Sequence, residues 1–321
     1  MKAHVIVAWL ALMAATLAAA APARAAGCPT IDLETPIETL ARQVSAWPAA
    51  DQVAAYRRTI VGPHAGLYRP EVLGVFAQGY DKAMLASLVG ARTDPARPQA
   101  LRDVRRALAG AERQFGVALP DFRCDFPIFL TDSLGRLDGA GRQVDGRPAL
   151  VLGVDQLAQE RDSLPLAVFL AHELFHRYHS QAAGFSDDPG EHQAIWRALW
   201  AEGLATYASQ QLTPGATVDE ALLVPRDLAA KAQPQIRAIS TDLLAHLDQI
   251  DPATYRTYFT YGDPKVTARG LPWRSGYYVG FLVAKDLGRR HSLRDLAHLK
   301  GAPLEAEIRQ ALQRLSGQAP E

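Results

Sequence analysis

The chain has 321 residues, with 34 basic and 34 acidic side chains and a formal net charge of zero at pH 7. It therefore lacks the basic surplus typical of proteins that bind nucleic acid or acidic lipid, and we expect neither as a partner. Its length allows one large domain or two.

The first 25 residues have the features of a secretory signal peptide. Lys2 supplies the positive charge, Val5 to Ala21 is apolar, and the Ala-Arg-Ala triplet at 23–25 matches a cleavage site. The apolar run of about 17 residues is marginal for a membrane span, and no other stretch matches it. We expect residues 1–25 to be removed on export, which leaves a periplasmic or secreted protein with no stable membrane span.

The chain has two cysteines, Cys28 and Cys124. In an oxidising compartment an even count predicts one disulfide, here joining the mature N-terminus to the body of the protein. The competing interpretation is a lipoprotein, because residues 25–28 loosely resemble an acylation motif ending at Cys28, although its leading Leu is missing. Two cysteines cannot form a structural zinc site alone.

The sequence pattern of residues 26–120 predicts a helical region, and this region contains no specific motif. Residues 35–59 have helical apolar spacing that Pro48 divides into two helices. Residues 71–89 predict a further helix. Residues 101–115 predict an amphipathic helix whose run of arginines is expected to face solvent.

Short apolar runs then predict two strands, at 126–131 and 149–154, separated by a Gly-rich polar loop with turn signals. A helix is expected at 166–180, after Pro165. The rest of the chain predicts further helices at 194–212, 222–246 (broken near Pro234), 275–287 and 304–315, with an irregular stretch at 251–273. The expected fold class is α+β and helix-dominated.

The helix at 166–180 contains His172-Glu173-Leu174-Phe175-His176, an HExxH motif. Two histidines four residues apart lie on one face of a helix, where both imidazoles can reach one tetrahedral zinc ion. Glu173, beside the first histidine, can act as general base on a water. Burying two histidines and a glutamate among apolar neighbours is costly without partners, which favours a Zn2+ site over an ordinary amphipathic helix.

Such a site needs a third ligand. The metzincin pattern requires Gly at 179 and His at 182, but the chain has His179 and Ala182 there. A deformylase-type site requires a Gly-Cys pair, but Cys124 follows an arginine. Both classes are excluded.

A glutamate on the following helix remains, and Glu202 is best placed because its neighbours are apolar. Glu191 and Asp188 are the alternatives. His179 shares the ligand face and is expected to support the site or to pack. Thr206, one turn after Glu202, can donate a supporting hydrogen bond to a ligand.

The HExxH segment together with Trp-Ala-Glu-Gly-Leu-Ala at 200–205 resembles the gluzincin metallopeptidases, and the second segment is similar to that of the aminopeptidase-like gluzincins. Gly-Tyr-Tyr-Val-Gly at 276–280 resembles the C-terminal Gly-Tyr-x-x-Gly element of a bacterial group of predicted zinc-dependent proteases, described as a domain of unknown function. The resemblance covers roughly 149–288. The spacing between the two ligand motifs is longer than usual, which places a loop insertion at 184–192.

The resemblance implies that residues 121–321 form a zincin-like metallopeptidase region, packed with residues 26–120 as one unit. In zincin folds an edge strand precedes the active-site helix and pairs with an extended peptide substrate. By this analogy the strand at 149–154 would be that edge strand.

The resemblance also implies a zinc-dependent peptidase that acts on peptides or proteins. Its metal ligands would be His172, His176 and Glu202. Glu173 would be the general base, and Tyr277 or Tyr278 would stabilise the oxyanion, with helix packing as the alternative role for the two tyrosines. The alternative function is a non-catalytic exported zinc-binding module with a zincin fold. The intact Glu173 favours the enzyme, because a structural site needs no general base.

Overall fold

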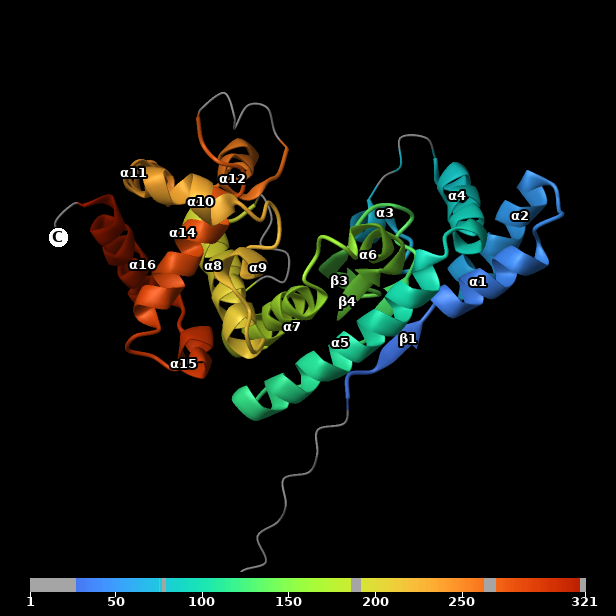
Figure 1. The fold of residues 1–321 in the computed structure, drawn as a ribbon, viewed down its shortest axis with the longest axis horizontal. Helices are drawn as coiled ribbons and strands as arrows, with labels where there is room; N and C mark the ends of the chain where they lie inside the picture. Colours follow the sequence, from blue (N-terminus) through green and yellow to red (C-terminus); the bar gives the residue numbers. More distant parts are fainter. Residues whose placement is uncertain (1–26, 75, 77–78, 186–191, 263–269, 318–321) are drawn as a thin grey trace, which may run out of the picture.

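The computed structural model describes residues 27–74, 76, 79–185, 192–262 and 270–317. The expected signal peptide lies outside these residues. Within them, helices dominate and one small sheet is present, so the predicted helix-dominated α+β class is confirmed. Figure 1 shows a lobe with the sheet and the early helices at one end, and a lobe of later helices at the other, with α7 between them. We call these the N-terminal lobe (27–165) and the C-terminal lobe (192–317).

The N-terminal lobe contains six α-helices, which are α1 (Glu34–Gln43), α2 (Ala49–Tyr56), α3 (Pro70–Leu73), α4 (Tyr80–Thr93), α5 (Ala96–Ala118) and α6 (Val154–Glu160). The break at Pro48 is confirmed. The single helix expected at 71–89 is wrong: α3 ends at Gly74 and α4 begins after Gly79, two glycines with φ of 85° and 78°. Positive φ is the left-handed region that glycine adopts without steric cost, and it does not continue a right-handed helix.

The sheet has four strands among the described residues, β1 (Thr30–Asp32), β2 (Ile128–Thr131), β3 (Gly139–Val144) and β4 (Arg147–Gly153), in the order β1-β2-β4-β3. β1, β2 and β4 are parallel, and β3 is antiparallel to β4. Two expectations are wrong here. The Gly-rich segment before β4 is a strand, not a loop. β4 is not an edge strand, because it lies between β2 and β3; the edge strands are β1 and β3.

The burial of β2 and β4 shows that both faces of the sheet are covered. Ile128, Leu130, Leu150 and Leu152 face the core formed with α5, α7 and the C-terminal helices. The alternate residues, Phe129 and Val151, face a second core under the N-terminal helices. Side chains alternate across a strand, so a continuous apolar run is the pattern of a strand covered on both faces.

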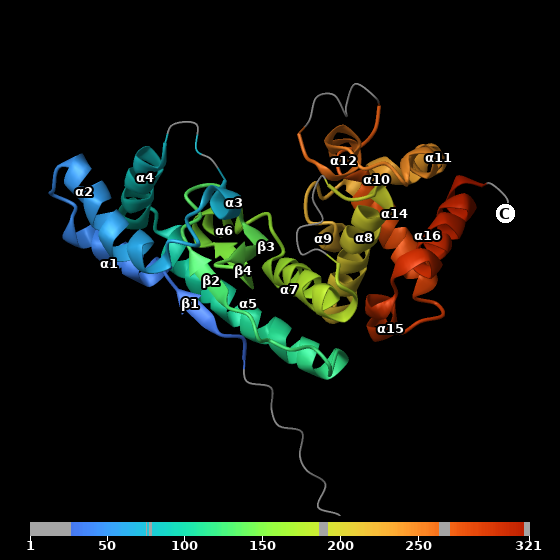
Figure 2. The same ribbon diagram turned by 180° about the vertical axis from the view of Figure 1, so that it is seen from behind.

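α7 (Leu166–Ala183) leads from the sheet to the C-terminal lobe, as Figure 2 also shows from behind. That lobe contains α8 (Ile195–Leu212), α9 (Val218–Ala221), α10 (Leu228–Ala232), α11 (Ile236–His246), α12 (Pro252–Phe259), α14 (Ser275–Leu287), α15 (Leu293–His298) and α16 (Gly301–Ser316). The helices expected over 194–212 and 275–287 are confirmed. α12 lies in the stretch expected to be irregular, where Asp251 caps it by accepting the Thr254 N–H at 2.8 Å.

A disulfide joins Cys28 to Cys124, so the pairing predicted from the cysteine count is confirmed. It fixes the segment before β1 beside α5, where the Cys28 N–H also donates to Glu112 Oε1 at 3.2 Å. The bond occupies the thiol that acylation of Cys28 would need. Among the described helices, none combines the length and the apolar character needed to cross a membrane.

Candidate metal centre

α7 places both histidines of the HExxH motif on one face. Their Nε2 atoms lie 3.0 Å apart, and the two side chains are almost fully buried, with residue exposures of 3% for His172 and 5% for His176. Burial lowers the pKa of His172 to about 4. A neutral imidazole offers a lone pair, which is the form that binds a metal.

α8 brings Glu202 to the same point. Its Oε2 atom lies 3.4 Å from His172 Nε2 and 3.5 Å from His176 Nε2. Burial alone would raise the pKa of Glu202, but the adjacent His176 and His172 side chains outweigh it and hold that pKa well below its usual value. The predicted ligand residues therefore converge, with one donor atom from each within 4.8 Å of the others.

Two glycines determine how closely α8 approaches α14. A Cβ added at Gly203 would lie 2.1 Å from the carbonyl carbon of Gly280, and one added at Gly280 would lie 2.4 Å from Leu199 O. These are glycines of the two motifs singled out in the sequence, so the motifs meet at a backbone contact. The contact holds Glu202 on α8 beside Tyr277 on α14.

The three donor atoms fit a zinc ion. Tetrahedral zinc with bonds of about 2.0–2.1 Å keeps its ligand atoms about 3.3 Å apart, close to the separations found here. Glu202 Oε2 is buried without a hydrogen-bond partner, which a metal ion would relieve. His172 Nδ1 is also unpartnered, and its ring is instead stacked on Tyr277, with centroids 6.4 Å apart.

A second group of donor residues, Cys28, Glu112 and Cys124, also lies close together. Its two sulfur atoms are joined in the disulfide, so they are not available as thiolate ligands. The described residues therefore contain one credible metal centre.

The centre opens into a pocket of about 350 Å³. Its walls come from the end of the sheet, from α7 and α8, and from the C-terminal lobe; besides the ligands, the lining residues include Asp138, Gly139, Ala140, Arg142, Phe169, Glu173, Leu223, Val224, Tyr255, Phe259, Tyr261, Arg274 and Tyr277. Glu173 is half-buried, and burial raises its pKa to about 7.

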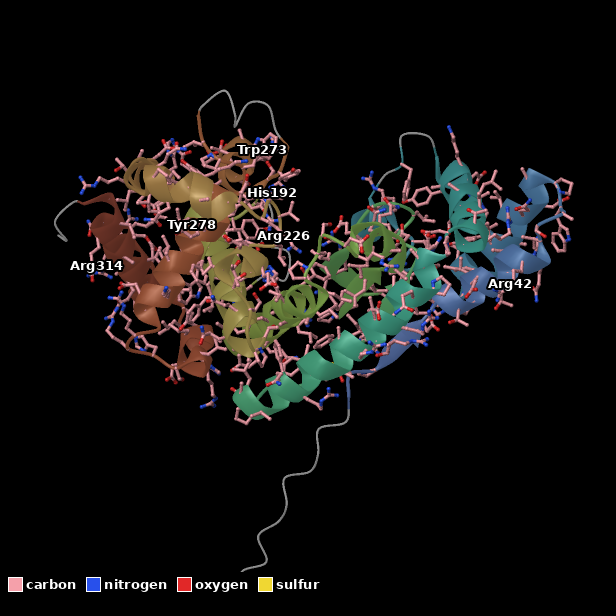
Figure 3. All side chains as sticks on the ribbon, in the orientation of Figure 1. Arg42, His192, Arg226, Trp273, Tyr278 and Arg314 are labelled. Carbon is pink, nitrogen blue, oxygen red and sulfur yellow. A yellow bond between two sulfur atoms is a disulfide. The ribbon has the colours of Figure 1, made fainter. Side chains whose placement is uncertain are left out.

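The structure separates the two candidate tyrosines. Tyr277 lines the pocket, and burial together with the neighbouring Glu202 carboxylate raises its pKa well above the ordinary value. Tyr278 points elsewhere: its hydroxyl donates to Gln233 Oε1 at 2.5 Å inside the C-terminal lobe (Figure 3). Tyr277 alone is therefore placed to contact a molecule in the pocket.

Two other sequence candidates, His179 and Thr206, lie near the centre without joining it. His179 stacks on Phe185, with ring centroids 4.2 Å apart. Thr206 donates to the backbone carbonyl of Glu202 at 2.8 Å, not to its carboxylate. Asp188 and Glu191, the alternative third ligands, lie outside the described residues.

The pocket residues that were not singled out from the sequence include Leu223, Val224, Tyr255, Phe259 and Tyr261, together with two parts that supply backbone or charge. One is β3, which supplies Gly139, Ala140 and Arg142. The other is Arg274. The one feature of the sequence that could have pointed to it is its position directly before the helix expected to carry the tyrosines.

No protein-family model, no curated protein and no solved structure matches the chain. The resemblance to gluzincins therefore rests on the motifs alone, and the case for a function rests on the geometry described above.

Proposed function

We propose that the protein is an exported zinc-dependent peptidase of the gluzincin type. The observation that carries the proposal is the convergence of His172, His176 and Glu202 on one point of a pocket that Glu173 also lines. A purely structural metal site needs neither an adjacent carboxylate nor an open pocket.

His172, His176 and Glu202 would hold the metal through their Nε2 and carboxylate oxygen atoms. Zinc held there would supply a Lewis acid that polarises a carbonyl group and makes water more acidic. The chain provides three ligand groups, the number usual for catalytic zinc sites.

Glu173 would move the proton. Its carboxylate belongs to the residue next to the first ligand and lines the same pocket, so it can take a proton from the water that attacks the scissile carbonyl. It would then deliver that proton to the amine nitrogen of the leaving group. Tyr277, buried beside Glu202, would donate its hydroxyl hydrogen to the developing oxyanion.

β3 would orient the substrate. It is one of the two edge strands of the sheet, and no described strand pairs with its outer side. Gly139 and Ala140 of this strand line the pocket. An extended peptide could add to this edge through backbone hydrogen bonds, which would hold it beside Glu173.

Export is supported by the signal-like N-terminus of the sequence and by the Cys28–Cys124 disulfide. Disulfides persist in oxidising compartments and are rare in the cytosol of most organisms. A periplasmic or secreted location fits both observations.

Two isosteric substitutions test the roles of the carboxylates. Glu173→Gln is expected to keep stoichiometric zinc but to lower peptide hydrolysis by about 10²- to 10⁴-fold, because an amide cannot move the proton. Glu202→Gln is expected to weaken zinc binding itself, because a neutral oxygen replaces an anionic ligand. Zinc content and hydrolysis of a broad peptide library are measured on each purified variant.

Glu307→Gln is the matched control, because Glu307 forms a partly exposed ion pair with Arg290 on the surface. It should change neither quantity. Zinc loss in Glu173→Gln together with zinc retention in Glu202→Gln would reverse the assignment. Wild-type protein that holds zinc but cleaves no library member would favour the non-catalytic binding module.

A further inference from the structure

Arg274 is a cation of the pocket wall without an anionic partner. Among the described residues, no carboxylate lies within ion-pair distance of its guanidinium, although it is half-buried. Of the other half-buried arginines, Arg309 contacts both Asp248 and Glu305, whereas Arg92 donates to the Ala41 carbonyl and the Gln52 side chain. An arginine held in a pocket without a carboxylate can bind one from outside the chain.

The backbone and the neighbouring side chains fix this guanidinium in place. Arg274 has φ of 58°, a left-handed conformation that non-glycine residues rarely adopt. Its Cζ atom lies 3.8 Å from the centroid of the Tyr277 ring, and Nη1 donates to Val224 O at 2.9 Å. The side chain is therefore ordered before any ligand arrives, which reduces the entropy lost on binding.

The guanidinium still has hydrogen-bonding capacity. Only Nη1 has a hydrogen-bond acceptor among the described residues, and Nε is buried without a partner. A planar guanidinium presents its N–H groups as a fork that matches the two oxygens of a carboxylate. The Tyr277 ring neighbours both this fork and the His172 imidazole, and Arg274 lines the same pocket as the three ligand residues, so a molecule bound at Arg274 would extend toward the metal centre.

We propose that Arg274 is a specificity-determining residue that binds a carboxylate of the peptide substrate. The inference rests on the proposed peptidase function and names the chemistry of the substrate. The carboxylate has two possible sources, the free C-terminus of a peptide or an acidic side chain, and both are tested. Arg142 also lines the pocket, but it donates to the Val72 and Gly141 carbonyls and is already engaged.

The test is a binding experiment with four fluorescently labelled peptides of equal length and neutral background sequence. They combine a free or amidated C-terminus with an internal Glu or Gln. Affinities are measured by anisotropy on the full chain carrying Glu173→Gln, which prevents turnover. Each measurement is made with zinc and after chelation, because a carboxylate can also bind the metal directly.

At least one peptide with a carboxylate is expected to bind about 10-fold more tightly than its neutral counterpart, with and without zinc. Tighter binding of the peptide with a free C-terminus, or of the peptide with internal Glu, identifies which carboxylate Arg274 binds. Adding Arg274→Gln should abolish that preference and leave the affinity for the neutral peptide within about 2-fold. Arg226→Gln is the matched control, because Arg226 is exposed, donates to Ser163 O, and is not among the residues that line the pocket.

Equal affinity for charged and neutral peptides would overturn the inference, as would the absence of binding by all four. An equal loss for every peptide in Arg274→Gln would also overturn it, since it would show that Arg274 only positions Tyr277. Failure of the peptidase proposal has a different signature: the carboxylate preference would persist in wild-type protein that hydrolyses no peptide.

Discussion

Two buried polar clusters of this protein differ in what satisfies their atoms. In the N-terminal lobe, Arg97 contacts Glu34 at 2.7 Å and Asp132 at 2.5 Å, and these side chains are at most 4% exposed. Asp132 also accepts a hydrogen bond from Ser87 Oγ, and its other oxygen accepts the Leu134 N–H at 2.7 Å. We call Glu34, Arg97 and Asp132 the lobe cluster.

The centre formed by His172, His176 and Glu202 is buried to a similar degree, with residue exposures of 3–5%. It brings together three lone-pair donors and no cation. Among the described residues, Glu202 Oε2 has no hydrogen-bond partner, but neither do Glu34 Oε2 and Arg97 Nε of the lobe cluster. Burial alone therefore does not distinguish the two clusters. Charge compensation does: the lobe cluster supplies its own cation, and the metal centre needs one from outside.

The largest expected effect is on the metal centre. His176→Ala should weaken zinc binding by on the order of 10⁴-fold, about 5 kcal/mol, because it removes one of three ligands. The unfolding free energy of the metal-free protein should change far less. Zinc titration and chemical unfolding of the metal-free variant measure both quantities, and retained stoichiometric zinc would show that the ligand assignment is wrong.

The lobe cluster should respond in the opposite way. Arg97→Leu is expected to lower the unfolding free energy by about 3–5 kcal/mol, because it leaves buried carboxylates without their cation. Zinc affinity should not change. Urea unfolding monitored by circular dichroism gives the first quantity, and zinc titration gives the second.

Arg105→Leu on the same helix is the control. Arg105 pairs with Asp32 at 2.5 Å, but its side chain is 49% exposed, and such surface pairs contribute less than about 1 kcal/mol. Similar losses for Arg97→Leu and Arg105→Leu would remove the distinction between a structural cluster and a surface pair.

A smaller effect is expected on the pH dependence of the unfolding free energy, through Glu34 of the lobe cluster. Burial raises the pKa of Glu34 to about 7, against the opposing influence of Arg97; Asp132 and Asp155 raise it further. The folded state then holds more protons than the unfolded state between about pH 4.5 and 7, so the contribution of Glu34 to stability falls as the pH rises through that range.

Wild-type protein should therefore lose about 2 kcal/mol of unfolding free energy between pH 5 and 7.5 relative to Glu34→Gln, which cannot ionise. Urea unfolding of the metal-free proteins at the two pH values measures the difference. Parallel pH profiles for the two proteins would contradict the raised pKa of Glu34.

The three residues of the proposed metal centre could be singled out from the sequence because each motif lies within one helix. The four-residue spacing of His172 and His176 fixes their common face locally, and the apolar neighbours of Glu202 place it on a buried helix. Packing at Gly203 and Gly280 brings α8 against α14 and so Glu202 beside Tyr277, and both glycines are visible in the sequence.

The lobe cluster could not be identified in this way. Its three residues come from α1, α5 and the end of β2, and each looks like an ordinary surface charge in its local sequence. Arg97 in particular precedes a run of arginines that do face solvent. β3 was missed for a related reason, because its sequence is rich in Gly and polar residues, and its pairing with β4 depends on the rest of the sheet.

The smallest expected effect concerns the paired tyrosines, which the sequence could not separate. Tyr277→Phe should lower kcat by about 10-fold and leave KM and zinc content nearly unchanged, because it removes one hydrogen-bond donor that acts on the developing oxyanion. The phenyl ring can still stack on His172 and support Arg274. Steady-state kinetics on a cleaved peptide provide the measurement.

Tyr278→Phe is the matched control, since the two residues are adjacent on α14. Loss of its hydrogen bond to Gln233 should lower the unfolding free energy by about 1 kcal/mol and leave kcat unchanged. A fall in kcat for Tyr278→Phe but not for Tyr277→Phe would exchange the roles of the two tyrosines. A fall in KM with kcat for Tyr277→Phe would instead indicate that its hydroxyl strains the bound substrate, because removing ground-state strain tightens binding while it slows the reaction.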